Sequence, residues 1–202
     1  INTGIYCCTA SFLFDALKHI STDNDQAEYY LPDIVSVAAQ RQLTVNASIT
    51  PDPEEVAGIN DRAALARAEK CMRGRILKAH MDSGVTIIDP DSTYIDTGVR
   101  IGRDTVVFPN SHIAGSTEIG SACRIEISCC VRDSLLGDGV HLRPSCVLDR
   151  CHVKDHAIIG PFAHLRPDAL VEPEAHIGNF VEVKKSVIGK GSKANHLTYL
   201  GD

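Results

Sequence analysis

The chain has 202 residues, with 20 basic and 26 acidic side chains that give a formal net charge of −6 at pH 7. This balance argues against a general nucleic-acid-binding protein, because neutralising phosphates requires a basic surface. No apolar run approaches the roughly 18 residues of a membrane span and no secretory signal precedes the first predicted strand. We therefore expect a cytoplasmic protein that binds no membrane.

The first 59 residues alternate between strand-like and helix-like segments. The pattern predicts strands over 1–8 and 43–50, and helices over 11–20 and 29–42. Such alternation is typical of α/β layers. Because the segment is too small for a complete doubly wound domain, we expect it to be the last portion of one.

One long helix is predicted over residues 60–84, where it would connect the first segment to the rest of the chain. Apolar side chains recur along it at spacings of three and four, at Leu65, Ala68, Met72, Ile76 and Ala79. Asn60 or Asp61 can cap its start, and Gly84 can end it. Such a helix would span about 30 Å, which is enough to separate two domains.

From about residue 95, an aliphatic side chain returns at every sixth position. The series is Ile95, Ile101, Val107, Ile113, Ile119, Ile125, Val131, Leu136, Leu142, Leu148, Val153, Ile159, Leu165, Val171, Ile177, Val183, Ile188, Ala194 and Leu200. This period fits neither an amphipathic helix nor a simple half-buried strand, and it is the signature of a hexapeptide β-helix. Three hexads make one triangular coil, so we expect a mainly β protein with six coils between residues 95 and 199.

Three steps of this series are five residues long instead of six. They begin at Val131, Leu148 and Val183, and counting the faces in threes places all of them at one edge of the prism. Residues 200–202 begin a seventh coil, and the chain starts at Ile1 rather than at a methionine. We therefore expect the sequence to be a piece of a longer protein.

The eight cysteines follow neither the paired spacing of metal sites nor a short disulfide scaffold. Cys123, Cys129 and Cys146 occupy a small inward position four residues after an aliphatic residue, and the last two fall one coil apart. We interpret these three as small buried hydrophobes. Cys7 and Cys8 belong to the separate strand predicted at the start of the chain.

Several local strings resemble one bacterial family. They are INTGIY, NDQAEYYLPD, VAGINDR, GVTIIDP, IGPFAHLRP, HIGNFVEVKK and KGSKANHLTYLGD. Together with the order of segments, they are similar to the bifunctional N-acetylglucosamine-1-phosphate uridylyltransferase/glucosamine-1-phosphate acetyltransferase. The resemblance covers essentially the whole chain.

The resemblance implies a left-handed β-helix that forms a homotrimer and transfers an acetyl group from acetyl-CoA to glucosamine-1-phosphate. It also implies an N-terminal nucleotidyltransferase domain that uses Mg²⁺ to make UDP-N-acetylglucosamine from UTP and N-acetylglucosamine-1-phosphate. Residues 1–59 would be the C-terminal part of that domain, 60–84 the linker helix and 85–202 a truncated acetyltransferase domain. The 202-residue piece is then expected to be inactive by itself.

Arg166 and Lys184 are expected on neighbouring rungs of one outer face, because each follows an inward aliphatic residue and they lie one coil apart. The planar donors of arginine and the mobile charge of lysine suit a sugar phosphate. Arg132 and Asp149 belong to the same file, so a solvated column of charges is the alternative.

His196 lies two residues after Ala194, the one inward position without a large aliphatic side chain. In the acetyl transfer that the resemblance implies, an imidazole can remove a proton from the attacking amine at neutral pH. We therefore predict His196 as the general base, although most histidines in a protein are surface residues. Tyr199, beside the face that carries Lys184, would donate a hydrogen bond to the sugar phosphate.

The resemblance assigns Asn2 to the N-acetylglucosamine moiety of the nucleotide sugar and Asn60 to the Mg²⁺ ion and the nucleotide. On the residues alone, Asn2 could simply end a strand and Asn60 could cap a helix. The family's glycine-rich nucleotide loop and its other metal-binding aspartate would precede Ile1, and its acetyl-CoA contacts would follow Asp202.

Two other classes of protein stay open. One is a sugar-1-phosphate nucleotidyltransferase with a purely structural β-helix, although the string HLTYLGD does not favour it. The other is a hexapeptide-repeat zinc hydratase of the carbonic anhydrase type, with three histidines around a trimer interface. His164, His176 and His196 would be its candidates, but it leaves the first segment and the long helix unexplained.

Overall fold

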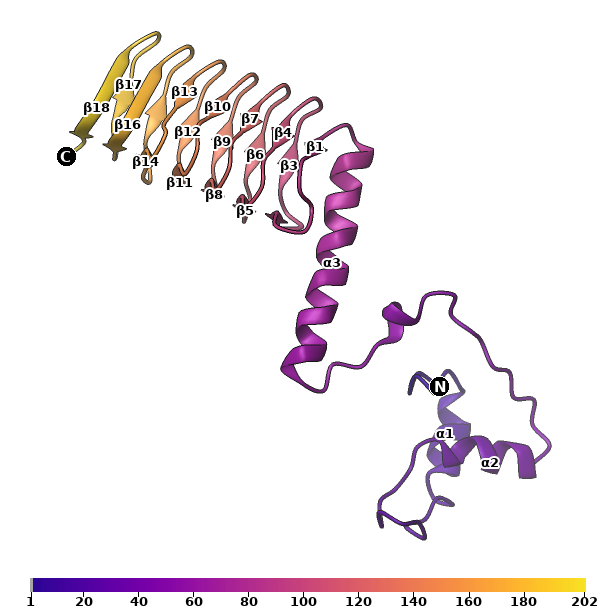
Figure 1. Ribbon diagram of the computed structural model, residues 1–202. Coiled ribbons are helices and arrows are strands. Elements are labelled where there is room, and N and C mark those ends of the chain that lie inside the picture. Colours follow the sequence, from indigo (N-terminus) through magenta and orange to yellow (C-terminus); the bar gives the residue numbers. More distant parts are fainter. Residues whose placement is uncertain (1) are drawn as a thin grey trace. The chain divides into compact units, whose positions relative to one another are not determined.

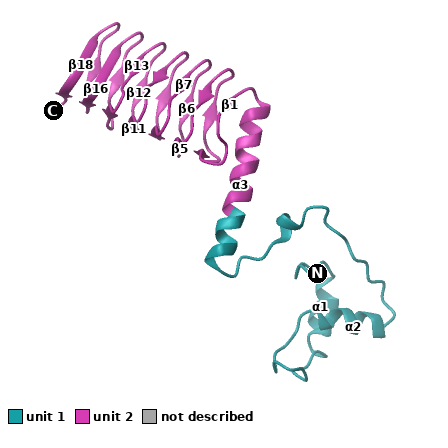
Figure 2. Cartoon of the chain, viewed as in Figure 1, with its two compact units in different colours: residues 1–68 teal, residues 69–202 magenta. Residues whose placement is uncertain are grey.

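The computed structural model describes residues 2–202. Its internal contacts divide the chain into two compact units, Ile1–Ala68 and Glu69–Asp202 (Figure 2). Within residues 2–202, no helix combines the length and the apolar character needed to cross a membrane.

The first unit contains two short α-helices and one 3₁₀ turn. They are α1 (Ala10–Ala16), α2 (Asp33–Gln40) and η1 (Pro53–Val56). The two α-helices lie within the predicted ranges except for one residue at the start of α1, where the Thr9 hydroxyl accepts a hydrogen bond from Phe12 N. A small apolar cluster packs between the helices, with Ala16, Ile34 and Val37 at its centre.

The strands predicted in the first unit are absent from the part of the chain that the structure describes. Residues 2–8 and 43–50 carry no strand and are mostly exposed, so this prediction was wrong. A β-strand needs a neighbour to take up its backbone hydrogen bonds, and the described part of this unit provides none. Cys7 and Cys8 are accordingly exposed free thiols.

The long helix is α3 (Arg62–Asp82), which begins and ends within two residues of the predicted bounds. Asp61 Oδ1 accepts a hydrogen bond from Ala64 N at 2.6 Å. Of the two predicted caps, the aspartate therefore makes the capping bond. Gly84 has a φ of +100°, a left-handed conformation that glycine adopts readily and that ends the helix.

The apolar stripe predicted for α3 is only partly correct. Leu65 and Met72 are more than half exposed, while Leu77, outside the predicted stripe, is 1% exposed. Leu77 belongs to the core of the second unit, and Ile76 packs against it. Only the last turns of the helix reach that core, so a stripe along the whole helix is not buried.

The second unit is a parallel β-helix of three faces, built from short strands that stack as successive rungs (Figure 1). Its strands are β1 (Thr86–Ile87), β2 (Tyr94–Ile95), β3 (Arg100–Ile101), β4 (Val106–Val107), β5 (His112–Ala114), β6 (Glu118–Ile119), β7 (Arg124–Ile125), β8 (Cys130–Arg132), β9 (Leu135–Leu136), β10 (His141–Leu142), β11 (Val147–Asp149), β12 (His152–Val153), β13 (Ile158–Ile159), β14 (His164–Leu165), β15 (Leu170–Val171), β16 (His176–Val183), β17 (Val187–Ile188) and β18 (Lys193–Leu200). The prediction of a parallel β-helix after a long helix is confirmed.

Each face of the β-helix is one ladder of parallel strands. The first is β1-β4-β7-β10-β13-β16 and the second is β2-β5-β8-β11-β14-β16, with β18 adding the last rung to both. The third is β3-β6-β9-β12-β15-β17. The structure adds strand pairs before Ile95, since Ile87 pairs with Val107. The hexapeptide count missed them because the segment between Ile87 and Ile95 is longer than a hexad.

The three shortened steps lie at the same corner, as predicted. They connect the second face to the third, between β8 and β9, between β11 and β12, and between β16 and β17. Asp133, Arg150 and Lys185 turn these corners with φ values of 46°, 47° and 47°. The six-residue corner of the same edge also contains a left-handed residue, Asp168 with a φ of 63°, so this conformation is common to both corner lengths.

The aliphatic series forms the core of the β-helix. Its fully buried members are Val107, Ile113, Ile125, Val131, Leu142, Leu148, Val153, Ile159, Leu165, Val171, Ile177 and Val183, all at 0% exposure. Cys123, Cys129 and Cys146 are buried free thiols in the same core, which confirms their interpretation as small hydrophobes.

Candidate functional site

The two longest strands, β16 and β18, pair along their whole length, from His176 opposite Lys193 to Val183 opposite Leu200. They cross the corner between the first and second faces without losing this pairing. A close approach makes this possible: a Cβ atom on Gly178 would lie only 1.6 Å from the carbonyl oxygen of the facing strand's residue 195. The sequence therefore keeps glycine where the two backbones touch.

Arg166 and Lys184 lie on consecutive rungs of the second face. Arg166 N donates to Val183 O at 2.8 Å, and Lys184 N donates to Leu200 O at 2.9 Å. This stacking confirms the placement that the six-residue repeat predicts. Their role in binding phosphate stays a prediction.

Both cations already contact a carboxylate. Arg166 Nη1 lies 2.8 Å from Glu182 Oε1, and Lys184 Nζ lies 3.4 Å from Asp202 Oδ1. Lys185 Nζ lies 3.9 Å from the other oxygen of Asp202. The Lys184 ammonium group holds the pKa of Asp202 below its usual value through a hydrogen bond and charge attraction. The lysine pair therefore stabilises an anion at this position.

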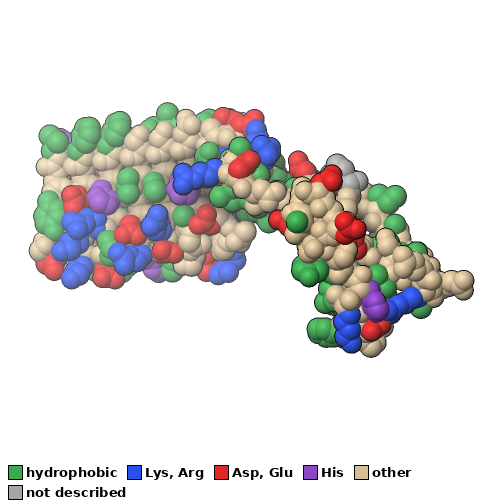
Figure 3. Space-filling model, turned by 90° about the horizontal axis from the view of Figure 1, so that it is seen from below, with side chains coloured by type: hydrophobic (Ala, Val, Ile, Leu, Met, Phe, Trp, Pro, Cys, Tyr) green, Lys and Arg blue, Asp and Glu red, His purple; other side chains and the backbone are tan. Residues whose placement is uncertain are grey.

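In Figure 3 charged side chains of both signs intermix over the lower part of the visible face of the β-helix, while its upper part is hydrophobic or uncharged. The file of Arg132 and Asp149 continues to Arg166 and Lys184, as the register of the strands requires. This file is thus a column of charged side chains of both signs. Lys184 differs from Arg132 because it lies beside β18, the strand that carries the predicted base, and Arg166 lies one rung before it.

His196 and Tyr199 both lie on β18. His196 is exposed and pairs with Asn179 through the backbone. Within residues 2–202 its imidazole makes no hydrogen bond. The Tyr199 hydroxyl donates to the Asp202 carbonyl at 2.9 Å, and the backbone of Tyr199 pairs with that of Glu182. The register therefore brings Arg166, Lys184 and Tyr199 to one face.

Asn2 and Asn60 belong to the first unit, whereas the other four predicted residues belong to the second. Asn2 Nδ2 donates to the Tyr6 hydroxyl at 2.6 Å, and its Oδ1 accepts from Gly4 N at 3.1 Å. Asn60 is exposed and directly precedes the aspartate that caps α3. No hydrogen bond joins the two asparagines within residues 2–202.

No group of three or more His, Cys, Asp or Glu side chains in the described part of the chain could hold a metal ion. His164, His176 and His196 thus form no zinc site within one chain. Asn60 can supply one amide oxygen, whereas Mg²⁺ is usually bound by one or two carboxylates together with waters and substrate phosphates. Residues 2–202 alone therefore do not complete the magnesium site that the resemblance implies.

The sequence prediction missed the carboxylates of this face. Glu182 precedes the inward residue Val183 at the end of β16, and Lys184 directly follows it, so both side chains point outward. A period-two reading of that strand could have placed Glu182 beside Arg166. The contact between Lys184 and Asp202 has no comparable signal, because it depends on the conformations of a long side chain and of the residues after β18.

The fold is a hexapeptide-repeat parallel β-helix, and one of its faces carries the stacked cations Arg166 and Lys184. No protein-family model matches the chain. Among solved structures, UDP-N-acetylglucosamine acyltransferase from Campylobacter jejuni aligns over 58% of this chain and 60% of its own, with 16% identity and a TM-score of 0.47.

Curated sequences are much more similar. Bifunctional protein GlmU from Geotalea uraniireducens (strain Rf4) is 52% identical over 202 residues, and that from Geobacillus sp. (strain WCH70) is 50% identical. The match covers 100% of this chain and 44% of each relative. The chain is thus similar to GlmU proteins over its whole length, and it spans less than half the length of these relatives.

Proposed function

We propose that this chain carries residues of an acetyl-transfer site in a bifunctional enzyme of UDP-N-acetylglucosamine synthesis. The observation that carries the proposal is the stack of Arg166 and Lys184 beside β18, the strand that holds His196 and Tyr199. The 52% identity to a bifunctional GlmU protein over all 202 residues supports it independently.

The proposed reaction moves the acetyl group of acetyl-CoA to the amine of glucosamine-1-phosphate. Arg166 and Lys184 bind the phosphate, and the Tyr199 hydroxyl donates a further hydrogen bond to it. The His196 imidazole takes a proton from the amine as the C–N bond forms and the C–S bond breaks. The leaving CoA thiolate is then protonated to the thiol.

Phosphate binding requires the local ion pairs to rearrange. The Asp202 carboxylate now lies against Lys184 and Lys185, and Glu182 lies against Arg166. A phosphate dianion at the same place offers more oxygens to these cations than one carboxylate does. It would displace Asp202, which is 62% exposed at its side chain and therefore free to move into solvent.

In the same proposal, N-acetylglucosamine-1-phosphate reacts with UTP at a Mg²⁺-dependent uridylyl-transfer site to which Asn2 and Asn60 contribute. Residues 1–59 then belong to a nucleotidyltransferase domain, 60–84 form a linker helix and 85–202 belong to the acetyltransferase domain. We propose that the full-length protein is a cytoplasmic homotrimer.

The first test replaces the proposed base. In the full-length protein, His196→Ala should lower acetyl-transfer turnover by about 100-fold, a typical contribution of a general base, while uridylyl transfer persists. An unchanged acetyl-transfer rate would show that His196 is not the base. A wild-type protein that makes UDP-N-acetylglucosamine but transfers no acetyl group would contradict the proposal as a whole.

The second test separates phosphate binding from a solvated column of charges. Arg166→Gln and Lys184→Gln should mainly raise the KM for glucosamine-1-phosphate, because ground state and transition state share these bonds. Arg132→Gln removes a cation from the same file two rungs earlier and is the matched control. If all three substitutions raised the KM equally, the specific phosphate site would be refuted.

A further inference from the structure

Strands β16 and β18 place one polar side chain directly beside the proposed base. Their backbones stay paired around the corner between the first and second faces, and Asn179 is the partner of His196 in that register. Val181 and Thr198 continue the pairing on the far side of the corner. The register therefore holds Asn179 and His196 at the same position of consecutive rungs, about 4.8 Å apart along the axis.

The two corners share one backbone conformation. Phe180 and Leu197, which follow Asn179 and His196, are both left-handed, with φ values of 54° and 49°. Phe162 turns the corner one coil earlier with a φ of 55°. The Phe162 and Phe180 rings stack there, 7° from parallel and with their centres 5.2 Å apart. Side chains thus leave consecutive rungs of this corner in the same direction and touch, and we expect the same of Asn179 and His196.

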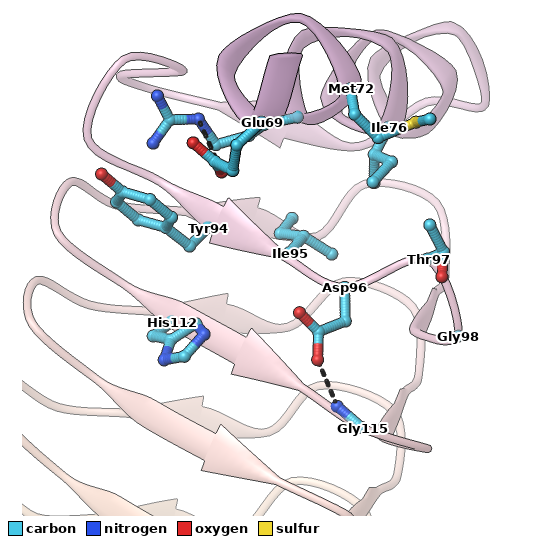
Figure 4. A pocket seen from close by; sticks show the side chains of 11 residues that line it. Glu69, Met72, Ile76, Tyr94, Ile95, Asp96, Thr97, Gly98, His112 and Gly115 are labelled. Atoms are coloured by element: carbon cyan, nitrogen blue, oxygen red, sulfur yellow. Dashed lines mark hydrogen bonds and ion pairs between the residues drawn. The ribbon is translucent and has the colours of Figure 1, made fainter. Parts of the chain in front are cut away.

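Outward side chains in register also meet at the other end of the β-helix. Tyr94 on β2 and His112 on β5 are register partners, and their rings meet edge to face with the centres 6.1 Å apart (Figure 4). An imidazole of this fold thus contacts the side chain at the same position of the neighbouring rung. For His196 that side chain is the carboxamide of Asn179.

Asn179 is the polar side chain of β16 that lies nearest to His196 in the register. Its neighbours in the strand, Gly178 and Phe180, have no polar side-chain atoms, and Glu182 already forms an ion pair. Among the described residues, neither the Asn179 amide nor the His196 imidazole makes a hydrogen bond. If each side chain leans by about 1 Å, the rung spacing of about 4.8 Å closes to a hydrogen bond of about 2.9 Å.

We propose that Asn179 is a positioning residue for His196. Its Oδ1 accepts a hydrogen bond from one ring N–H, which fixes the tautomer and the ring plane and leaves the lone pair of the other nitrogen for the amine proton. A carboxamide is neutral, so it orients the imidazole without placing a charge beside it. This inference rests on the proposed acetyl transfer, in which His196 is the base.

The test compares acetyl transfer by the full-length protein and its variants. Asn179→Ala should lower kcat about tenfold, because a base that rotates freely is less often aligned with the amine, and should leave the KM for glucosamine-1-phosphate within about twofold. Asn179→Asp keeps an acceptor oxygen, and its negative charge favours the imidazolium. The acid limb of its pH profile should therefore move about one unit to higher pH, which a purely structural role would not cause.

Asn195→Ala is the matched control, since Asn195 is an exposed asparagine of β18 directly before His196, and it should keep the wild-type kcat. The double variant Asn179→Ala/His196→Ala should be no slower than His196→Ala, because Asn179 acts only through the imidazole. The pH profile of Asn179→Asp decides the inference even if Asn179→Ala does not fold, as judged by its melting curve.

The outcomes separate this inference from the proposed function. Wild-type kcat in Asn179→Ala, an unmoved acid limb in Asn179→Asp or an additional loss in the double variant would overturn the positioning role and leave His196 as the base. Wild-type activity of His196→Ala would instead refute the base, and the positioning role with it.

Discussion

Gly178 is the position where one added methyl group should disturb the candidate site most directly. A Cβ atom there would lie 1.6 Å from the carbonyl oxygen of Asn195 and 2.5 Å from its carbonyl carbon. An ordinary C···O contact is about 3.3 Å, so β16 and β18 would have to separate by roughly 1.7 Å. A backbone bond such as His176 N to Ser192 O, now 2.8 Å, would not survive that displacement.

The damage from Gly178→Ala should concentrate in β18. Overpacking of this kind typically costs about 1–3 kcal/mol. In the described part of the chain β18 pairs only with β16, so it has no second strand to hold it in place. Strands β11 and β14 are paired on both sides and should keep their stability.

Hydrogen exchange followed by mass spectrometry measures this effect. Amides of residues 193–200 should exchange at least tenfold faster in Gly178→Ala, because 1.4 kcal/mol corresponds to a factor of ten. Gly189→Ala is the matched control, since its added Cβ would meet Ser192 Oγ at an ordinary 3.4 Å. Wild-type protection of β18 in Gly178→Ala would refute the close approach on which this reasoning rests.

Three further predictions concern the core and its titratable groups. Leu136→Ala should lower the free energy of unfolding by about 2–5 kcal/mol. Leu135→Ala, at the outward neighbour with 43% exposure, should lower it by less than half as much. Equal losses in urea unfolding would contradict the assigned faces. Burial lowers the pKa of His176, so the unfolded state binds protons first, and the free energy of unfolding should fall as the pH drops below about 6.5. His176→Asn should flatten this dependence in urea midpoints measured from pH 8 to 5, and an unchanged slope would exclude His176 as its source. Burial raises the pKa of Cys151 to about 11, so a thiol reagent at pH 8 should modify Cys151 only after unfolding, and rapid labelling of the folded protein would contradict its burial.

The β-helix could be predicted from the sequence because every repeat contributes its own buried residue to the core. Each inward aliphatic residue packs against those one coil away, so the period alone identifies the buried side chains. The strand before Ile95 was not predicted, because the connection from Ile87 to Ile95 does not follow the six-residue period. The six-residue pattern thus identifies the regular coils of the β-helix. Its first coil directly follows α3 and does not show the pattern.

The strands predicted in the first unit failed for the opposite reason. Residues 2–8 and 43–50 have strand-like composition, but pairing depends on partners that no local pattern specifies. The helices of the same unit were predicted well because their hydrogen bonds are internal to each segment. Local sequence decides a helix more completely than it decides a strand.

Part of the candidate site was likewise accessible to sequence. The stacking of Arg166 and Lys184 follows from backbone register, which the aliphatic series determines. Their ion pairs with Glu182 and Asp202 depend on side-chain conformation and were not predicted. The sequence also could not decide between Asp61 and Asn60 as the cap of α3, since both residue types are good caps.

The corner between the second and third faces explains why the cationic file stays aligned although the coils differ in length. The file contains Arg132, Asp149, Arg166 and Lys184, and a shortened corner follows all of them except Arg166. The register is nevertheless kept, because a one-residue slip would turn every inward side chain outward. The missing residue is accommodated in the corner, outside the paired strands, whose register is unchanged. Functional side chains of this β-helix must therefore be aligned by face and rung, since the intervals along this file are 17, 17 and 18 residues.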